Sequence, residues 1–274
     1  MILLDQSGAA AKESKLFSPS RNLALFVEHF WVQQPLSGPI GPSWRVIPEA
    51  NPNLIFVVSH AEAGCIRTRC FLVGPRSRFA DVVISKRIFT CGARLRPGTL
   101  PLLTHFPAGD FTDRSLHVEE VFGARGRSLM NELNEFRPSI QVIGTLAAFL
   151  GRELAGCKYA VPLSQSRCNR VEEMAVQAGM PLRTLHSRLM QQVGLSPKRL
   201  LRIERLHRVL ANCQLRSVPW AQLAVTCGFS DQAHMIREFQ ELLGESPTAW
   251  SNRSAVPICS RQRGTSQPSL SEEV

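Results

Sequence analysis

Two short segments in the C-terminal third of the sequence carry polar side chains of the types that contact nucleic acids. Arginine and glutamine can form paired hydrogen bonds with base edges, whereas serine and threonine suit phosphate oxygens. A solvated helix face has a similar composition, so the residue types alone leave both interpretations open. The candidates are Arg183, Thr184, His186, Ser187 and Arg188 in the first segment, and Ser230, Gln232, Ala233, His234 and Arg237 in the second.

Each segment lies within one copy of an internal repeat. The first copy runs from Val171 to Pro197 and the second from Trp220 to Pro247. Both contain a short helical stretch with a small alanine, a glycine four residues later, a second helical stretch and then Gly-x-x-Pro. Internal repeats report architecture, and this order of elements predicts two copies of a helix-turn-helix.

The small and apolar residues of the repeat suit the packing of such a unit. Alanine lets two helices approach closely, glycine can adopt the left-handed conformation that ends a helix, and an apolar residue after it can pack on the core. These residues are Ala175, Gly179 and Met180 in the first copy, and Ala224, Gly228 and Phe229 in the second. On the second helices we expect the buried residues to be Leu182, Leu185 and Leu189, and Met235, Phe239 and Leu242.

One continuous helix from Pro197 to Asn212 is predicted to join the two copies. Apolar residues recur on one side of it, and its other side is basic. The apolar residues are Leu200, Ile203, Leu206 and Leu210, and the basic ones are Lys198, Arg199, Arg202, Arg205 and Arg208. A rigid connector would hold the two polar faces about 34 Å apart, one turn of DNA. Arg202 or Arg208 could contact phosphates, with a plain solvated face as the alternative.

The run Cys227 to Phe239, followed by Gly244 to Trp250, resembles the second repeat of the AraC/XylS family of DNA-binding transcription regulators, and the resemblance extends from Val171 to Trp250. It implies recognition helices that begin near Pro181 and Asp231 and present the polar candidates to duplex DNA. Pro181 is a departure, because the family commonly has a serine there that caps the helix. Proline suits a first helical turn, so the fold should survive while one phosphate contact is in doubt.

The N-terminal half has the pattern of a β-rich domain. Short β-branched and aromatic runs at 26–32, 54–58, 66–73, 82–84 and 87–93 alternate with Pro/Gly turns. This pattern predicts an antiparallel β-barrel or jelly roll, and with helices at 129–136 and 140–154 the whole chain is an α+β two-domain protein. The apolar stripe of the second helix could dock on the barrel or pair with its copy in a dimer, and docking is favoured.

Parts of this half, including Val27–Trp31 and Phe111–Gly123, resemble a cupin-like sensor domain that often precedes such DNA-binding units. The resemblance implies a small-molecule effector or a role in dimerisation. Trp31, Trp44, Arg45 and Arg96 could line an effector pocket, with ordinary packing as the alternative. The expected domains are therefore 1–160 for effector binding or dimerisation, a linker at 161–169, 170–253 for DNA binding, and a disordered tail at 254–274.

The net charge of +10 and the pI near 9.7 favour a polyanionic partner. The basic excess is spread over both halves, so charge alone is weak support. No stretch has the length of a membrane-spanning helix, and Met1 to Leu16 does not read as a signal peptide. The expectation is a cytoplasmic, nucleoid-associated protein whose partners are duplex DNA, with RNA polymerase, a small effector and a second copy as further possibilities.

An enzyme is the alternative class, in the form of a metal-dependent cupin oxygenase with a DNA-binding appendage. Such a site needs converging histidine and carboxylate ligands, and His29, His60, His105 and His117 are isolated in the sequence. His186 and His234 lack a suitably spaced carboxylate. The eight cysteines form no C-x-x-C pair and are expected to be reduced thiols, none of them marked as an activated alkyl acceptor. We expect no catalysis, no cofactor and no metal.

Overall fold

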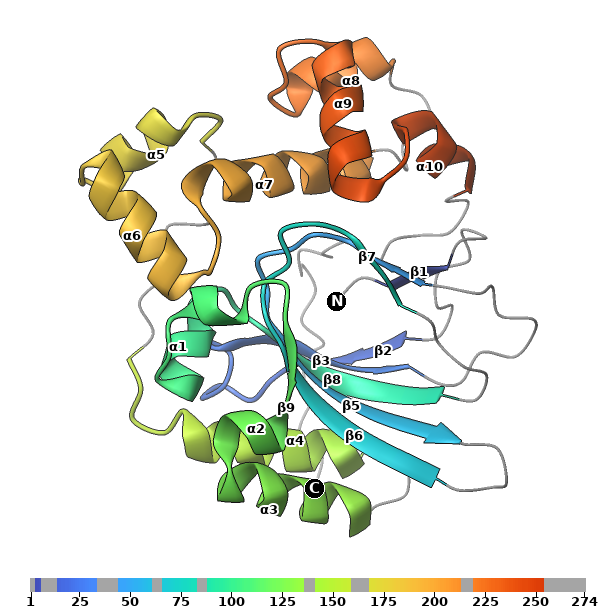
Figure 1. The fold of residues 1–274 in the computed structure, drawn as a ribbon, viewed down its shortest axis with the longest axis vertical. Coiled ribbons are helices and arrows are strands. Elements are labelled where there is room, and N and C mark those ends of the chain that lie inside the picture. Colours follow the sequence, from blue (N-terminus) through green and yellow to red (C-terminus); the bar gives the residue numbers. More distant parts are fainter. Residues whose placement is uncertain are drawn as a thin grey trace, which may run out of the picture.

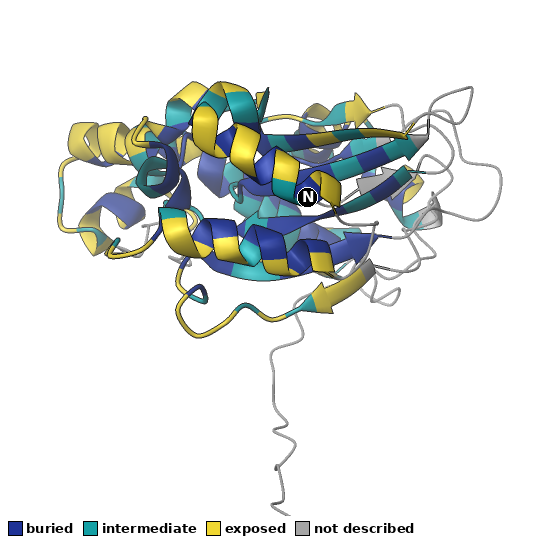
Figure 2. Ribbon diagram, turned by 90° about the horizontal axis from the view of Figure 1, so that it is seen from below, coloured by how far each residue is buried: buried dark blue, intermediate teal, exposed yellow. Residues whose placement is uncertain are grey.

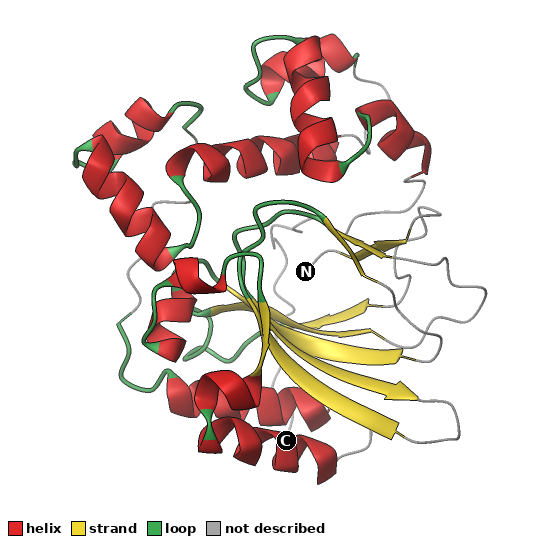
Figure 3. Cartoon of the chain, in the orientation of Figure 1, coloured by secondary structure: helices red, strands yellow, loops and turns green. Residues whose placement is uncertain are grey.

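The computed structural model describes residues 3–5, 14–33, 44–60, 66–82, 88–135, 141–158, 168–212 and 219–253. Within these residues, an N-terminal part of strands and helices precedes a wholly helical C-terminal part (Figure 1, Figure 3). This arrangement confirms the predicted α+β organisation. Most of the predicted linker at 161–169 and all of the predicted tail at 254–274 lie outside the described residues.

Two antiparallel sheets form the N-terminal part. Across the larger sheet the order is β2 (Ser14–Phe17), β3 (Val27–Gln33), β8 (Ile88–Leu95), β5 (Asn53–His60), β6 (Ile66–Val73) and β9 (Ser115–His117). Across the smaller sheet it is β1 (Leu3–Asp5), β4 (Trp44–Val46) and β7 (Ala80–Val82). Four of the predicted strands correspond to β3, β5, β6 and β8. The fifth, at 82–84, shares only Val82 with β7, and its other residues lie outside the described residues.

The described strands do not close into the predicted barrel or jelly roll. In a closed barrel every strand has two neighbours, whereas β2 and β9 are unjoined edges of the larger sheet and the smaller sheet pairs only within itself. Both edge strands are short, with four and three residues, which offers little backbone for another pairing. The N-terminal part is therefore an open antiparallel sheet accompanied by a small second sheet.

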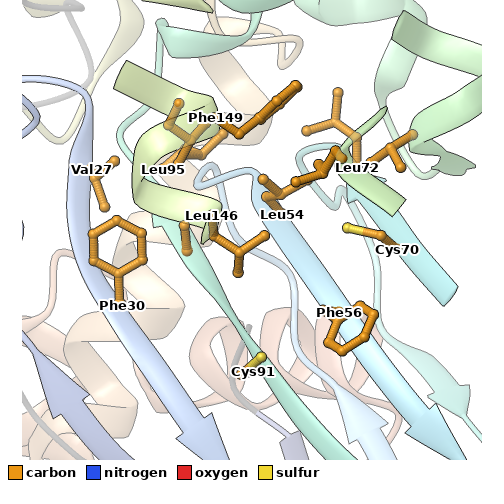
Figure 4. Close-up of a cluster of buried hydrophobic side chains, with 14 of the residues drawn as sticks. Val27, Phe30, Leu54, Phe56, Cys70, Leu72, Cys91, Leu95, Leu146 and Phe149 are labelled. Atoms are coloured by element: carbon orange, nitrogen blue, oxygen red, sulfur yellow. The ribbon is translucent and has the colours of Figure 1, made fainter. Parts of the chain in front are cut away.

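Helices cover one face of the larger sheet and bury the main core (Figure 1). Leu146 and Phe149 of α4 pack over Phe30, Leu54 and Phe56 of the strands (Figure 4). The apolar stripe predicted at 140–154 thus docks on the sheet, and its buried residues are not free to pair with a second copy. The helices of this part are α1 (Thr99–Thr104), the 3-10 helix η2 (Ala108–Phe111), α2 (Val118–Phe122), α3 (Ala124–Glu135) and α4 (Gln141–Glu153).

The other face of the larger sheet carries a separate, smaller apolar cluster. Successive side chains of a strand point to opposite faces, so this cluster does not share the helix-covered core. It consists of Trp31, Ile55 and Val73, with the partly buried Val57 and Phe71 packed against them. The smaller sheet lies on this side of the larger one in Figure 1.

The C-terminal part consists of two helical units joined by α7, and each unit has its own apolar core. The predicted connector is confirmed, because α7 spans Pro197–Asn212 and Leu200, Ile203, Leu206 and Leu210 are all buried. Alternating buried and exposed positions are visible along the helices in the foreground of Figure 2. The remaining helices are α5 (Val171–Gln177), α6 (Leu182–Gln192), α8 (Trp220–Thr226), α9 (Gln232–Leu243) and α10 (Pro247–Arg253).

Residues 45–50, which start within β4, join the sheet part to both helical units. Ile47 belongs to the core of the second unit, and Ala50 packs against the core of the first. The carbonyl of Pro48 accepts a hydrogen bond of 2.6 Å from Nε2 of the half-buried His207 on α7. Burial lowers the pKa of His207, which favours the neutral ring. The two parts of the protein therefore share an apolar and hydrogen-bonded interface.

A buried charged cluster anchors this segment to the sheet. Arg94 of β8 forms ion pairs with Glu28, at 3.1 Å, and with Glu49, whose side chain is 3% exposed. The amide of Asn53 donates a further hydrogen bond of 3.1 Å to Glu49. Burial by itself would raise the pKa of Glu49, but the positive charge of Arg94 outweighs it and the pKa falls to about 2.

None of the described helices is both long enough and apolar enough to cross a bilayer. The five cysteines in the described residues carry free thiols, and Cys227 lies in the core of the second unit. Burial raises the pKa of Cys91 to about 12, so this thiol is not activated.

Replacing Glu49 with Gln should lower the free energy of unfolding at pH 7 by about 3 kcal/mol, because a buried arginine loses its closest charge partner. Since the folded pKa is about 2 and the ordinary value 4.5, the stabilisation is complete above pH 4.5 and is lost as the pH falls towards 2. Urea unfolding at several pH values should therefore show wild type and variant converging in acid.

The matched control is Glu132→Gln, which removes an exposed ion pair with Arg152 and should change stability by less than about 1 kcal/mol at every pH. A gap between wild type and Glu49→Gln that stayed constant down to pH 3 would contradict the assigned role of Glu49.

Candidate nucleic-acid interface

The first helix-turn-helix unit consists of α5 and α6. The turn contains Gly179 with φ of 61°, the predicted left-handed conformation, and the buried Ala175 lets the two helices approach. The N–H of Met180 donates to the carbonyl of Ala175 at 3.1 Å and closes the turn. Pro181 occupies the N-cap position of α6 and makes no side-chain cap, as its lack of a hydroxyl requires.

The second unit, of α8 and α9, repeats this geometry with a capped recognition helix. Gly228 has φ of 87°, and the N–H of Phe229 donates to the carbonyl of the buried Ala224 at 3.0 Å. The carboxylate of Asp231 accepts a hydrogen bond of 2.7 Å from the backbone N–H of His234. This bond favours the charged carboxylate and lowers the pKa of Asp231.

Most of the polar candidates lie exposed on the second helix of each unit or in the turn before it. Arg183, Thr184, His186, Ser187 and Arg188 are exposed on α6, and Ser230, Gln232, Ala233 and Arg237 are exposed at α9. The half-buried His234 is the exception. Its Nδ1 lies 3.0 Å from the hydroxyl of Ser230, and its ring packs edge-on against Phe229. Each unit therefore presents a polar helix face of the kind that the repeat predicts.

Leu182 corrects one predicted core position. It was expected to be buried with Leu185 and Leu189, but 49% of its surface is exposed while those two residues are fully buried. Leu182 is the first residue of α6, at the end next to the turn, so it lies beyond the part of the helix that the core covers. The corresponding prediction for Met235, Phe239 and Leu242 is confirmed.

The arginines of α7 do not form the solvated basic side that the sequence suggests. Arg202 pairs with Glu238 at 2.6 Å and Glu241 at 2.5 Å, and its side chain is only 13% exposed. Arg199 lies 3.5 Å from the same Glu241. Arg202 therefore ties α7 to α9, and its guanidinium is occupied within the domain. The predicted phosphate contact would require these pairs to break.

Two further arginines of α7 contact the ends of other elements. The guanidinium of Arg205 lies over the ring of Phe229, 5.4 Å from its centre, and Nη1 of Arg208 donates to the side-chain oxygen of Asn169 at 2.9 Å. Sequence reasoning missed these partners, because they lie far along the chain and share no local periodicity with α7. For Arg202 the sequence did contain a signal, because Glu238 and Glu241 are three residues apart and therefore lie on one side of α9.

Glu204 is a titratable group on the half-buried side of α7. Burial raises its pKa to about 7, and the nearby positive charge of Arg208 opposes this rise only in part. The carboxylate is therefore unfavourable in the folded protein at neutral pH.

The four candidate effector-pocket residues are not brought together. Trp31 lies in the apolar cluster on the face of the larger sheet opposite the main core, and its buried Nε1 has no hydrogen-bond partner within the described residues. Arg45 pairs with Asp81 at 2.8 Å and donates to the carbonyl of Leu243 at 2.7 Å, so it faces the helical part. Arg96 donates to the carbonyl of Ala24. Trp44 lies on β4, and its side chain is outside the described residues.

The part of the chain that the structure describes contains no group of three histidine, cysteine or acidic side chains placed to share a metal ion. Burial lowers the pKa of His29, which lies beside Arg94 and Glu28 in the charged cluster described above.

Comparison with known proteins matches two separate segments of the chain. Residues 174–253 match a family described as a helix-turn-helix domain, and residues 15–117 match a domain of unknown function (DUF6597). The chain is 35% identical over 74 residues to the HTH-type transcriptional activator RhaS of Pectobacterium atrosepticum, which is 27% of this chain and 26% of the relative. It is 38% identical over 79 residues to RhaS of Yersinia pestis, covering 27% and 28% of the two chains.

The chain thus spans about a quarter of the length of the curated relatives that it matches. Among solved structures it is similar to ToxT of Vibrio cholerae, with a TM-score of 0.41, 11% identity, and coverage of 82% of this chain and 98% of that one. A TM-score of this size does not establish a common fold.

Replacing Arg202 with Ala should lower the free energy of unfolding by about 1–3 kcal/mol. The substitution removes the ionic link between α7 and α9 and leaves the carboxylates of Glu238 and Glu241 without their arginine partner. Lys198→Ala, at an exposed position of the same helix, should change stability by no more than about 0.5 kcal/mol. Chemical denaturation of both variants measures the difference. Equal, small effects would show that Arg202 has no role in holding the second unit.

Replacing Glu204 with Gln should stabilise the protein at pH 8 by up to about 3 kcal/mol. The folded pKa of about 7 exceeds the ordinary 4.5, so wild-type stability is highest below pH 4.5 and declines as the pH rises through 7. The variant lacks this decline, so the stability difference between variant and wild type should shrink as the pH falls from 8 towards 5. Thermal unfolding between pH 5 and pH 8 measures this difference. The control is Glu135→Gln, at an exposed position, which should show no such trend.

Proposed function

We propose that this chain, whose residues 174–253 are a helix-turn-helix domain of the AraC family of transcription regulators, regulates transcription by binding a specific site in duplex DNA. The observation that carries the proposal is the pair of exposed polar helix faces, on α6 and α9, held at the two ends of the single helix α7 (Figure 1). A helix presented in this way can enter the major groove, where the four base pairs are distinguishable.

The exposed residues divide into two roles. Arg183 on α6, and Gln232 and Arg237 on α9, have the side chains that can make paired hydrogen bonds to base edges. Thr184, Ser187 and Ser230 suit phosphate oxygens. His186, Arg188, Ala233 and His234 complete the two faces. Arg202 is assigned to holding α9 in place, in view of its ion pairs with Glu238 and Glu241.

We further propose that the N-terminal part binds a small effector on the face of its larger sheet opposite the helix-covered core. The apolar cluster on this face contains the buried Nε1–H of Trp31, which has no partner within the described residues and which an acceptor atom of a ligand would satisfy. Thermal-shift screening of a metabolite panel tests this proposal, with Trp31→Phe retaining the ring packing and removing the donor. A compound that stabilises wild type and Trp31→Phe alike would argue against a site at this residue. Contacts with RNA polymerase and with a second copy remain predictions.

Genome-wide capture of DNA fragments by the intact protein tests the proposed function. The expected result is a short shared sequence motif among the bound fragments, recovered far less well by the double variant His186→Ala, Arg237→Ala. Diffuse recovery that this variant shares with wild type would mean that binding is only electrostatic. In that case the specific-regulator proposal fails.

The single variant Arg237→Ala should weaken binding to the recovered motif by about 1–3 kcal/mol if Arg237 reads a base. It should weaken binding to every sequence alike if it contacts only a phosphate. Fluorescence anisotropy at one fixed salt concentration, on the motif and on a scrambled duplex, separates the two outcomes. Arg127→Ala, an equal charge change at an exposed position on α3, is the control.

A further inference from the structure

The N-terminal part approaches α6 so closely that a side chain would not fit comfortably at the contact. A Cβ atom placed on Gly109, in η2, would lie 3.2 Å from the backbone oxygen of Met190 on α6. Helix α1 also contacts α6, and Figure 1 shows α6 running from α5 down to α1. The sheet domain therefore packs against one flank of the first recognition helix.

That flank includes residues of the DNA-facing side. Arg183, His186 and Ser187 form one wall of a shallow groove whose other wall consists of Pro107, Gly109 and Asp110 from the N-terminal part. A recognition helix lies in a major groove about 12 Å wide, bordered on both sides by phosphate strands. A phosphate strand that ran along this flank of α6 would meet the turn at Pro107–Asp110, and the carboxylate of Asp110 would repel it.

The end of α6 is held in the same arrangement. The hydroxyl of Thr112, just after η2, donates a hydrogen bond of 2.5 Å to the carbonyl of Gly194. A Cβ atom on Gly194 would lie 2.8 Å from the ring of Pro75, so the helix end is packed against backbone and ring. The position of α6 relative to the sheet domain is thus fixed by close packing as well as by a hydrogen bond.

The second recognition helix is held differently. At the C-terminal end of α9, Arg45 donates to the carbonyl of Leu243 and Phe79 packs by Gly244, and Ile47 shares the apolar core on the buried side of this helix. Gln232 is eleven residues before Leu243, about 16 Å along the helix. The polar face of α9 therefore starts well away from the sheet domain.

Building on the proposed function, we infer that the N-terminal part blocks the DNA-facing side of α6 and leaves that of α9 open. In this conformation the protein reads DNA through its second unit alone. Separation of η2 from α6 admits the first unit and extends the recognised site by a second block of sequence, about one helical turn away.

The Gly109→Leu variant tests this inference in the full-length chain. Gly109 does not have a left-handed φ, so its backbone accepts a side chain, and leucine would wedge η2 away from Met190. The control is Gly144→Leu, at an exposed site on α4 with no atom close to the added side chain. In vitro selection from a random duplex library is run with wild type and with both variants.

Wild type and Gly144→Leu should select one conserved block, which Arg237→Ala abolishes. Gly109→Leu should select two blocks. The second block should be lost when Arg183→Ala is added to this variant. Gly109→Leu should also bind the two-block duplex about tenfold more tightly than wild type, which is within the usual range of coupling between sites. Two blocks selected equally by wild type, or a single block selected by Gly109→Leu, would overturn the inference and leave the proposed function standing. If neither wild type nor Gly109→Leu selected any motif, both the inference and the proposed function would be overturned.

A second variant covers the case in which Gly109→Leu does not fold. Thr112→Val removes the hydroxyl that bonds to Gly194 and keeps the side-chain shape, and it should shift selection in the same direction by a smaller factor. Thr104→Val is its control, because that hydroxyl donates to the carbonyl of Leu100 and accepts from the N–H of Phe106, both at α1 and not at α6. Identical selection by Thr112→Val and Thr104→Val would count against the proposed block.

Discussion

Helix α7 is the constraint on which the rest of the helical part depends. Leu200 and Ile203 lie in the core of the first unit, and Leu206 and Leu210 lie in the core of the second. A continuous helix of sixteen residues is about 24 Å long and does not bend easily. The two units therefore cannot slide towards each other, and the distance between their polar faces is already fixed in the protein without DNA.

The arginines of this helix change how the basic charge of the chain should be understood. Arg202 and Arg205 connect α7 to α9 and to the turn before it, so their charges support the architecture. Within the described residues, the exposed cations on the two recognition helices are Arg183, Arg188 and Arg237. Because phosphate contacts supply most non-specific affinity, such faces favour discrimination between sequences over tight binding to any sequence.

What the sequence predicts well here is local. Helical periodicity identified α7 to the residue, and glycine chemistry identified the turns at Gly179 and Gly228, because both signals lie within a few neighbouring residues. Interactions across the chain were not predictable in this way. Arg45 meets Leu243, 198 positions away, and short edge strands such as β9 have no periodicity long enough to detect. The polar faces were therefore predicted from sequence, and their relation to the sheet domain required the fold.

Ile47 gives the chain an order of assembly. It lies in the core of the second helical unit, although it follows β4 near the start of the chain. Protein synthesis proceeds from the N-terminus, and domains generally fold as they emerge. The sheet part can therefore be complete, with Ile47 already in position, before α8 and α9 leave the ribosome. The helices α8 and α9 would then fold against Ile47. A fragment that lacked the sheet part would lack this side chain and would have a gap in the core of its second unit.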